Sequence, residues 1–172
     1  EKNININEAS IDSRKTKKDN IFFGIKGKNF DGNKFINQAL NNGASIVINQ
    51  NKSTNPVKNK IYVKNSLKTF SESAKLIRIS SNISSIAITG SAGKTSLKEL
   101  LGQMIGKLYQ TSYSKKSFNN KYGVPISLFN INKEDKIGIF EVGMDKKGEI
   151  DFLTKIIMPN IGVITNISYA HI

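Results

Sequence analysis

A short glycine-containing segment, residues 89–96, constrains the fold more than any other feature of the chain. The apolar run 86–88 precedes it and is typical of a buried strand. After it, apolar residues recur at steps of three and one, the period of one helix face: Leu97, Leu100, Leu101, Met104, Ile105 and Leu108. A strand, a glycine turn and an amphipathic helix in this order predict an α/β unit with a parallel sheet.

The segment itself, Thr89-Gly90-Ser91-Ala92-Gly93-Lys94-Thr95-Ser96, predicts a phosphate loop. Glycines let backbone N–H groups turn toward phosphate oxygens, and the following helix presents its positive N-terminal end. We expect Lys94 to reach the β- and γ-phosphates of a nucleotide and the Thr95 hydroxyl to bind Mg²⁺. The general motif has a glycine at the position of Ile88, so the loop is a variant, and a plain glycine turn is the alternative.

Two further residues are candidates for the same edge of the sheet. Glu141 follows the apolar run 137–140, and His171 follows the run 161–167. Carboxyl ends of parallel strands meet at one edge, beside the phosphate loop, where a carboxylate suits Mg²⁺. An ordinary strand-end glutamate is the alternative for Glu141. A lone histidine is more often structural, and the residues alone favour that interpretation of His171.

The first half of the chain also alternates strands and helices. Ile4 and Ile6 alternate with polar residues, as in a half-buried strand, and the runs 21–25, 46–48 and 61–63 predict further strands. Asp31 and Ser66 are candidate N-caps of two helices. The polar stretch 80–85 marks a boundary between a domain at residues 1–82 and a second at 83–172.

Composition excludes several kinds of site. The chain has no cysteine, which rules out disulfides, thiolate metal sites and a cysteine nucleophile. A net charge of +13 is compatible with a nucleic-acid-binding module, but the positive residues are nearly all scattered lysines, which favours a compositional bias. No apolar run reaches the roughly 18 residues that a membrane span needs. The N-terminus lacks a secretion signal, so the prediction is a cytoplasmic protein.

Several segments, in order along nearly the whole chain, resemble the Mur ligase family, the ATP-dependent ligases of peptidoglycan synthesis. Residues 12–14, 21–27 and 30–32 are similar to the uridine-nucleotide-binding domain, and residues 88–99 are similar to the family's own short phosphate loop. Residues 118–125 and 141–150 are most similar to the member that adds D-alanyl-D-alanine, and residues 164–171 complete the series. The family often has histidine where this chain has Asn33.

The resemblance implies a small N-terminal α/β uridine-binding domain followed by part of a P-loop parallel-sheet ATPase domain. It implies an enzyme that uses ATP and Mg²⁺ to join D-Ala-D-Ala to UDP-N-acetylmuramoyl-tripeptide through an acyl phosphate. A monomer that binds no nucleic acid and does not insert into membranes is expected. Family members are well over twice this length, so this chain alone is expected to be inactive. The alternatives are a Mur ligase that adds the third peptide residue and a generic P-loop NTPase.

The resemblance also implies roles for individual residues. Lys94, Glu141 and His171 would be catalytic, and Thr95, Glu141 and His171 would hold metal ions. The ATP-binding loop would comprise Gly90, Ser91, Ala92, Gly93, Lys94, Thr95 and Ser96. The substrate-binding residues would be Ser13 and Arg14 at the uridine end, and Asn119 and Asn120 near the phosphates.

Overall fold

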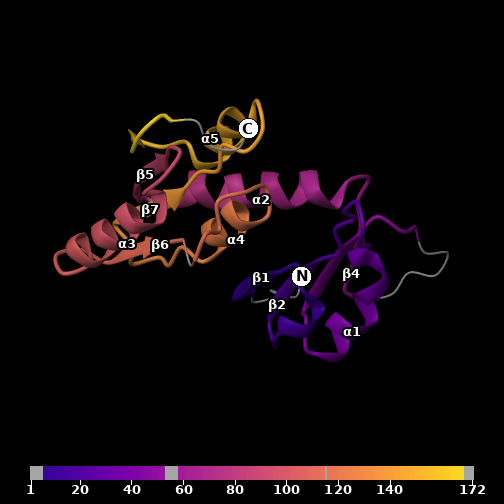
Figure 1. Ribbon diagram of the computed structural model, residues 1–172. Helices are drawn as coiled ribbons and strands as arrows, with labels where there is room; N and C mark the ends of the chain where they lie inside the picture. Colours follow the sequence, from indigo (N-terminus) through magenta and orange to yellow (C-terminus); the bar gives the residue numbers. More distant parts are fainter. Residues whose placement is uncertain (1–5, 53–57, 115, 169–172) are drawn as a thin grey trace. The chain divides into compact units, whose positions relative to one another are not determined.

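The computed structural model describes residues 6–52, 58–114 and 116–168. The chain forms two compact units, Glu1–Phe70 and Ser71–Ile172, coloured from indigo to yellow along the sequence in Figure 1. Each unit contains one four-stranded sheet whose paired strands are all parallel. This arrangement confirms the predicted α/β class. The units divide within helix α2 (Ser66–Ser80), and the domain boundary expected between residues 82 and 83 stays a prediction.

In the first unit, strands follow one another across the sheet in the order β1-β2-β3-β4. The elements are β1 (Glu8–Ser10), β2 (Asn20–Phe23), β3 (Ile46–Asn49), β4 (Lys60–Tyr62), the 3-10 helices η1 (Ser13–Lys15) and η2 (Gly32–Phe35), and α1 (Ile36–Asn41). Crossovers between parallel strands place α1 against the sheet. The core of this unit consists of Phe22, Ile36, Ala39, Ala44 and Val47.

Two local predictions for the first half need correction. The strand expected at Ile4 and Ile6 is displaced: Ile6 precedes β1, and Ile4 lies outside the described residues. Pairing decides the position, because the parallel register opposes Glu8 to Asn20. Helix α2 is capped by Asn65 rather than by Ser66, since the Asn65 side-chain oxygen accepts the N–H of Lys68 at 2.9 Å. The cap predicted at Asp31 is confirmed for η2, where its carboxylate accepts the N–H of Asn33.

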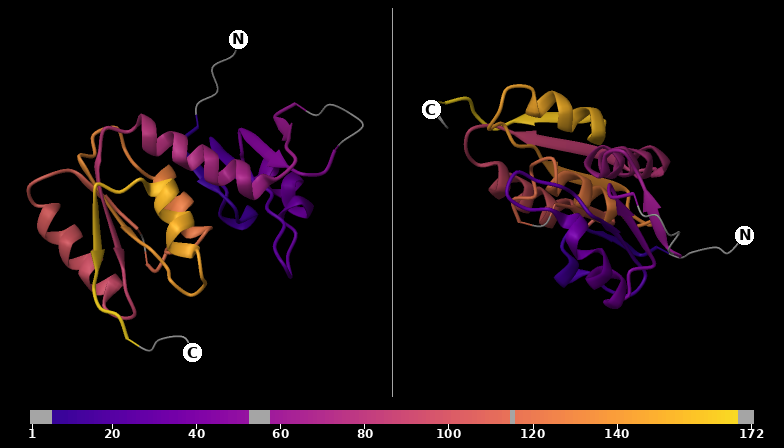
Figure 2. Two further views of the ribbon diagram at one scale, coloured as in Figure 1. Left: turned by 90° about the horizontal axis from the view of Figure 1, so that it is seen from above. Right: turned by 90° about the vertical axis from the view of Figure 1, so that its right-hand side faces the viewer.

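In the second unit the strand order is β6-β7-β5-β8. The elements are β5 (Ser84–Thr89), α3 (Lys94–Ile105), β6 (Thr111–Tyr113), α4 (Gly123–Phe129), β7 (Ile137–Glu141), α5 (Glu149–Ile157) and β8 (Ile161–Ile164). Helices α3 and α5 lie on opposite faces of this sheet (Figure 2, left). The core under α4 and α5 consists of Ala74, Ile83, Ala87, Val124, Leu128, Phe140, Val142, Leu153, Ile156 and Ile157. In the described ranges, no helix combines the length and hydrophobicity needed to cross a bilayer.

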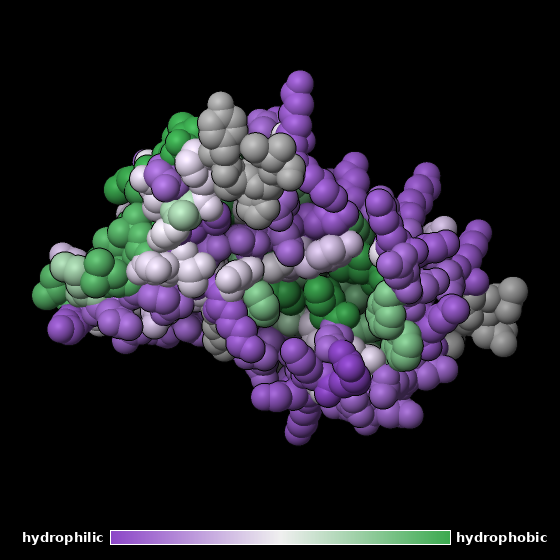
Figure 3. All heavy atoms as spheres, in the orientation of Figure 1, coloured by the Kyte–Doolittle hydropathy of each residue, from purple (hydrophilic) through white to green (hydrophobic). Residues whose placement is uncertain are grey.

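Helix α3 buries only part of the face that its apolar period predicts, since Leu97, Leu101 and Ile105 are half-buried. Leu100, Met104 and Leu108 are 53%, 57% and 79% exposed, and Figure 3 shows hydrophobic side chains gathered over this helix. The buried positions are Lys98 and Gly102. A Cβ on Gly102 would lie 2.9–3.0 Å from the Tyr113 ring, so close approach to β6 selects this face. The helix ends at Ile105, one turn before the predicted end.

A buried arginine joins α2 to the end of α5 within the second unit. The Arg78 Nε donates to the carbonyl of Ile157 at 2.8 Å, and an Nη donates to the Ser85 hydroxyl at 2.7 Å. The same Nη donates to the carbonyl of Met158 at 3.3 Å. Burial lowers the pKa of Arg78, but the group stays charged and supplies the last carbonyls of α5 with donors.

Candidate functional site

The predicted phosphate loop connects β5 to α3 and turns tightly at its two glycines. Gly90 has a φ of +134° and Gly93 a φ of +81°, values that side chains disfavour. Gly93 is the N-cap of α3, so the N–H groups of the first helical turn lack intrahelical partners. The Lys94 ammonium donates to the carbonyl of Gly90 at 2.5 Å. The loop therefore places a cation and unpaired backbone donors at one sheet edge.

Glu141, the last residue of β7, carries a buried carboxylate beside this loop. Side chains alternate along a strand, and Phe140 points into the core under α4 and α5, so Glu141 points toward α3. The residue is 1% exposed. The Thr95 hydroxyl donates to one carboxylate oxygen at 2.8 Å, and the Asn119 amide donates to the other at 2.9 Å. Thr95 and Asn119, which were predicted from separate segments, therefore both contact the predicted Glu141 carboxylate.

This donor set fits Mg²⁺. Carboxylate and hydroxyl oxygens are hard ligands, and Mg²⁺ in nucleotide sites commonly takes one or two carboxylates together with phosphate oxygens and water. Thr95 and Glu141 would hold the ion, which supplies positive charge against the phosphates when bound. Over the ranges that the structure describes, His, Cys, Asp and Glu form no group of three. His171 lies outside the described residues, so its role as a metal ligand stays a prediction.

The two adjacent asparagines have different contacts. Asn119 joins Glu141 through its side chain and accepts the N–H of Gly143 at 2.6 Å through its carbonyl. The Asn120 side-chain oxygen accepts the N–H groups of Tyr122 and Gly123, both at 3.0 Å. Asn120 therefore closes a turn just before α4, whose N-cap is Tyr122. Its role toward substrate stays a prediction.

Two residues that the sequence pattern does not predict also support this site. Lys98 is fully buried, donates to the carbonyl of Lys116 at 2.6 Å and lies 3.1 Å from Glu99 Oε1. The Ser114 hydroxyl accepts the N–H of Glu141 at 3.2 Å. Together they hold the segment before Asn119 against α3 and β7. Hydrophobic periodicity does not predict that a lysine such as Lys98 lies on the buried face of a helix. A serine after a strand, such as Ser114, is too common in sequences to indicate a contact.

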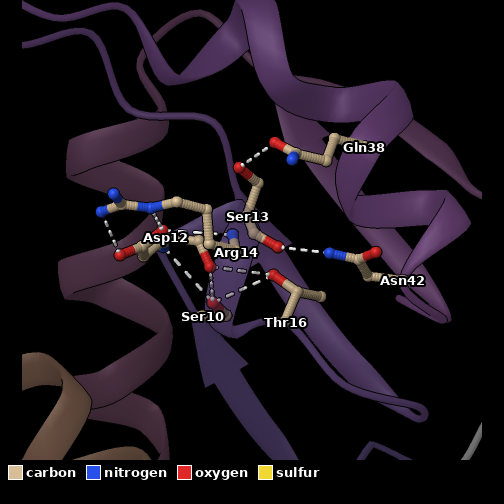
Figure 4. A network of polar contacts seen from close by, with 7 residues as sticks. All are labelled: Ser10, Asp12, Ser13, Arg14, Thr16, Gln38 and Asn42. Carbon is tan, nitrogen blue, oxygen red and sulfur yellow. Dashed lines mark hydrogen bonds and ion pairs between the residues drawn. The ribbon is translucent and has the colours of Figure 1, made fainter.

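The first unit contains the residues predicted for the uridine end. A pocket of about 510 Å³ is lined by Ile11, Asp12, Ser13, Arg14, Phe30, Phe35 and Gln38. The Ser13 hydroxyl donates to the Gln38 side-chain oxygen at 2.7 Å (Figure 4). Phe30 and Phe35 stack with ring centroids 5.0 Å apart and planes 9° from parallel. The pocket thus combines flat aromatic surface with polar groups, a combination typical of ligand sites.

An ion pair fixes Arg14 at the rim of this pocket. Its Nε and an Nη each donate to an oxygen of Asp12 at 2.9 Å (Figure 4). The Arg14 side chain is 79% exposed. The side-chain hydrogen bond from Arg14 lowers the pKa of Asp12, although slight burial opposes the shift. The guanidinium is therefore oriented by the carboxylate and open to solvent.

Asn33, which stands where the resemblance often has histidine, has internal partners. Its side-chain oxygen accepts the N–H of Gln50 at 2.8 Å, and its amide donates to Asp31 at 2.7 Å. The residue is buried. These contacts connect the start of η2 to the end of β3, so they assign Asn33 a structural role in the first unit.

Comparisons with known proteins match both halves of the chain. The model of the Mur ligase family catalytic domain matches residues 5–92, and that of the Mur ligase middle domain matches residues 88–172. A ligase of Buchnera aphidicola named UDP-N-acetylmuramoyl-tripeptide–D-alanyl-D-alanine ligase is 37% identical over 98% of this chain and 37% of its own length.

Solved structures give the same result. MurF from Acinetobacter baumannii is 31% identical, with a TM-score of 0.89 over 96% of this chain and 37% of that one. The MurF ligase from Thermotoga maritima in complex with ADP is 30% identical, with a TM-score of 0.83 over 96% of this chain and 39% of that one. The chain thus spans less than two fifths of these relatives. On both its sequence and its fold, the chain belongs to the Mur ligase family.

Proposed function

We propose that the chain carries the UDP-substrate site and the nucleotide-phosphate site of an ATP-dependent ligase that adds D-Ala-D-Ala to UDP-N-acetylmuramoyl-tripeptide. The observation that carries the proposal is the meeting of Thr95, Asn119 and Glu141 beside the phosphate loop. Relatives with the name of that ligase match nearly the whole chain, and one solved relative holds ADP. A cytoplasmic location and a monomeric state stay predictions.

The proposed reaction needs ATP because a carboxylate is a poor acyl donor. An oxygen of the tripeptide's terminal carboxylate attacks the γ-phosphorus, and ADP leaves. The amine of D-Ala-D-Ala then attacks the acyl carbon, phosphate leaves with the electrons of the C–O bond, and the amine nitrogen loses a proton. The first step brings two anions together. Lys94 and the N-terminal end of α3 supply positive charge at the loop, which acts by position and electrostatics.

Arg14 and the stacked phenylalanines support binding of the uridine end. Two of the five guanidinium N–H donors are directed to Asp12, so the group keeps further donors for a diphosphate or a base. The stacked rings of Phe30 and Phe35 offer a flat surface at the same pocket. A generic P-loop NTPase would need no such unit, and the match of the catalytic-domain model over residues 5–92 favours the ligase.

The test measures the two ligands separately on the purified chain by calorimetry. Lys94→Ala should weaken binding of ADP with Mg²⁺ by at least tenfold, because a charged phosphate contact is lost. Arg14→Ala should weaken binding of UDP-N-acetylmuramoyl-tripeptide by a similar factor. Lys107→Ala and Lys17→Ala remove the same charge from exposed positions and serve as matched controls. Equal losses in variant and control would contradict the assignment and favour a diffuse electrostatic effect.

With ATP, Mg²⁺, UDP-linked tripeptide and D-Ala-D-Ala together, the 172-residue chain alone should form no peptide bond. Relatives with the ligase name are more than twice as long, and catalysis of this kind requires all three substrates to be held with water excluded. Pentapeptide formation, followed by chromatography, would contradict the expectation.

A further inference from the structure

The segment that follows β8 runs along the phosphate loop and is bonded to it at successive residues. The Thr165 N–H donates to the carbonyl of Thr89 at 2.9 Å, and the Ser91 N–H donates to the carbonyl of Asn166 at 3.1 Å. The Ser168 N–H donates to the Ser91 hydroxyl at 3.0 Å. The loop is therefore supported along its length by residues about 75 positions later in the sequence.

Ala92 is held at both of its backbone polar groups. Its N–H donates to the Asn166 side-chain oxygen at 2.9 Å, and its carbonyl accepts the Thr165 hydroxyl at 2.5 Å. The C=O and N–H of one trans peptide point in opposite directions. With the Ala92 carbonyl fixed on Thr165, the N–H of Gly93 must point away from Thr165. Thr165 thus orients the Ala92–Gly93 peptide, which begins the turn into α3, and Asn166 orients the preceding Ser91–Ala92 peptide.

Gly90 provides an independent sign that this contact is close. A Cβ at Gly90 would lie 2.1 Å from the Thr165 hydroxyl and 3.0 Å from the Asn166 carbonyl oxygen. A Cβ at Gly93 would meet nothing nearer than Thr165 Cβ at 3.9 Å. The two glycines therefore have different functions: Gly90 makes room for the segment after β8, and Gly93 provides the left-handed turn.

We propose that Thr165 and Asn166 are positioning residues of the phosphate loop. Asn166 holds the Ser91–Ala92 peptide and Thr165 holds the Ala92–Gly93 peptide, so that the Gly93 N–H faces the nucleotide phosphates. The inference rests on the proposed nucleotide site. Neither side chain needs to touch the nucleotide, because each acts through the loop backbone. Binding of any ligand that carries a diphosphate depends on both residues, whereas binding of adenosine does not.

The experiment uses the purified chain with ADP or pyrophosphate as the probe, each with Mg²⁺. Thr165→Val removes the hydroxyl at constant shape, and Asn166→Ala removes the side-chain oxygen. Each variant should bind both probes roughly five- to tenfold more weakly, which corresponds to one hydrogen bond. Thr165→Ser restores the hydroxyl and should restore affinity. Ser168→Ala is the matched control, because the bonds of Ser168 to Ser91 use backbone atoms.

Amide hydrogen exchange of Ala92, with thermal melting, separates a local effect from unfolding. In Asn166→Ala the Ala92 N–H should exchange faster while the melting temperature stays within about 2 °C, since the site is exposed. Unchanged probe affinity in both variants would overturn the inference. Tighter binding would also overturn it, since the segment would then compete with phosphate. If the unmodified chain binds neither probe, the proposed nucleotide site itself fails.

Discussion

The two candidate sites differ in how deeply their polar groups are buried. At the first, Arg14 is 79% exposed and held by an ion pair with Asp12. At the second, Glu141 is 1% exposed and both its oxygens accept bonds from neutral donors, Thr95 and Asn119. Water screens the exposed pair, whereas a buried carboxylate depends on its donors. The second site should therefore depend on its hydrogen-bond donors more strongly than the first.

The difference follows from the elements that carry each site. Arg14 lies on η1, a one-turn 3-10 helix after β1, where the side chain projects from the surface. Glu141 ends β7, which lies between β5 and β6 in the sheet and is covered by α3. A strand inside a parallel sheet with helices on both faces is buried on both sides. The end of an inner strand therefore buries the Glu141 carboxylate, whereas the 3-10 helix leaves the Arg14 guanidinium exposed.

The largest expected effect comes from the buried arginine. Arg78→Met should lower the free energy of unfolding by about 2–4 kcal/mol, because the carbonyls of Ile157 and Met158 and the Ser85 hydroxyl lose a donor. Urea denaturation followed by circular dichroism measures the change. Arg14→Met is the matched control and should change the midpoint only slightly, because the Arg14 side chain is exposed. Equal losses of stability in the two variants would show that burial of the arginine does not explain the difference.

A smaller effect is expected at the buried carboxylate. In Glu141→Gln the side-chain oxygen still accepts the Asn119 amide, and the new amide donates to the Thr95 hydroxyl, so stability should hardly change. The charge is lost, and the gain in ADP affinity that Mg²⁺ provides should fall by at least about tenfold. Calorimetry with and without Mg²⁺ measures that gain.

Glu149→Gln is the control for this substitution, since Glu149 accepts the N–H of Asp145 nearby at 3.0 Å. A Mg²⁺ effect that survives in Glu141→Gln but disappears in Glu149→Gln would move the metal site to the other carboxylate. The second candidate site would then no longer depend on the buried Glu141 carboxylate, and the difference in burial between the two sites would not apply.

The sequence was sufficient to predict the features that depend on local order. The apolar runs around residues 86–88 and 137–140, with the glycine turn between strand and helix, gave β5, β7 and the start of α3. Because parallel strands share their carboxyl edge, the proximity of Glu141 to Thr95 also followed from the pattern. These predictions succeed since each depends on periodicity or on strand direction alone.

Features set by distant contacts could not be predicted. Lys98 is buried and Leu100 exposed because α3 approaches β6 at Gly102, which the helical period does not encode. The support of the phosphate loop by Thr165 and Asn166 joins segments about 75 residues apart. β1 begins at Glu8 because its register with β2 decides the position. In each case tertiary pairing selects among faces or registers that the local pattern leaves equivalent.

The smallest expected effect concerns the exposed ion pair and appears only with pH. The hydrogen bond from Arg14 lowers the pKa of Asp12 below its ordinary value of 3.8. A carboxyl group with a lower pKa in the folded state stabilises the fold above its unfolded pKa and loses that contribution as the pH falls through the folded value.

Asp12→Asn keeps an acceptor for the Arg14 N–H but cannot titrate. The denaturation midpoints of the unmodified chain and the variant should therefore differ slightly near pH 7 and converge below about pH 4. Arg14→Gln should reduce the convergence, because the guanidinium hydrogen bond, the largest cause of the lowered Asp12 pKa, is lost while the backbone N–H bond remains. A difference that stays constant from pH 7 down to about pH 3 would show that the ion pair does not form in solution.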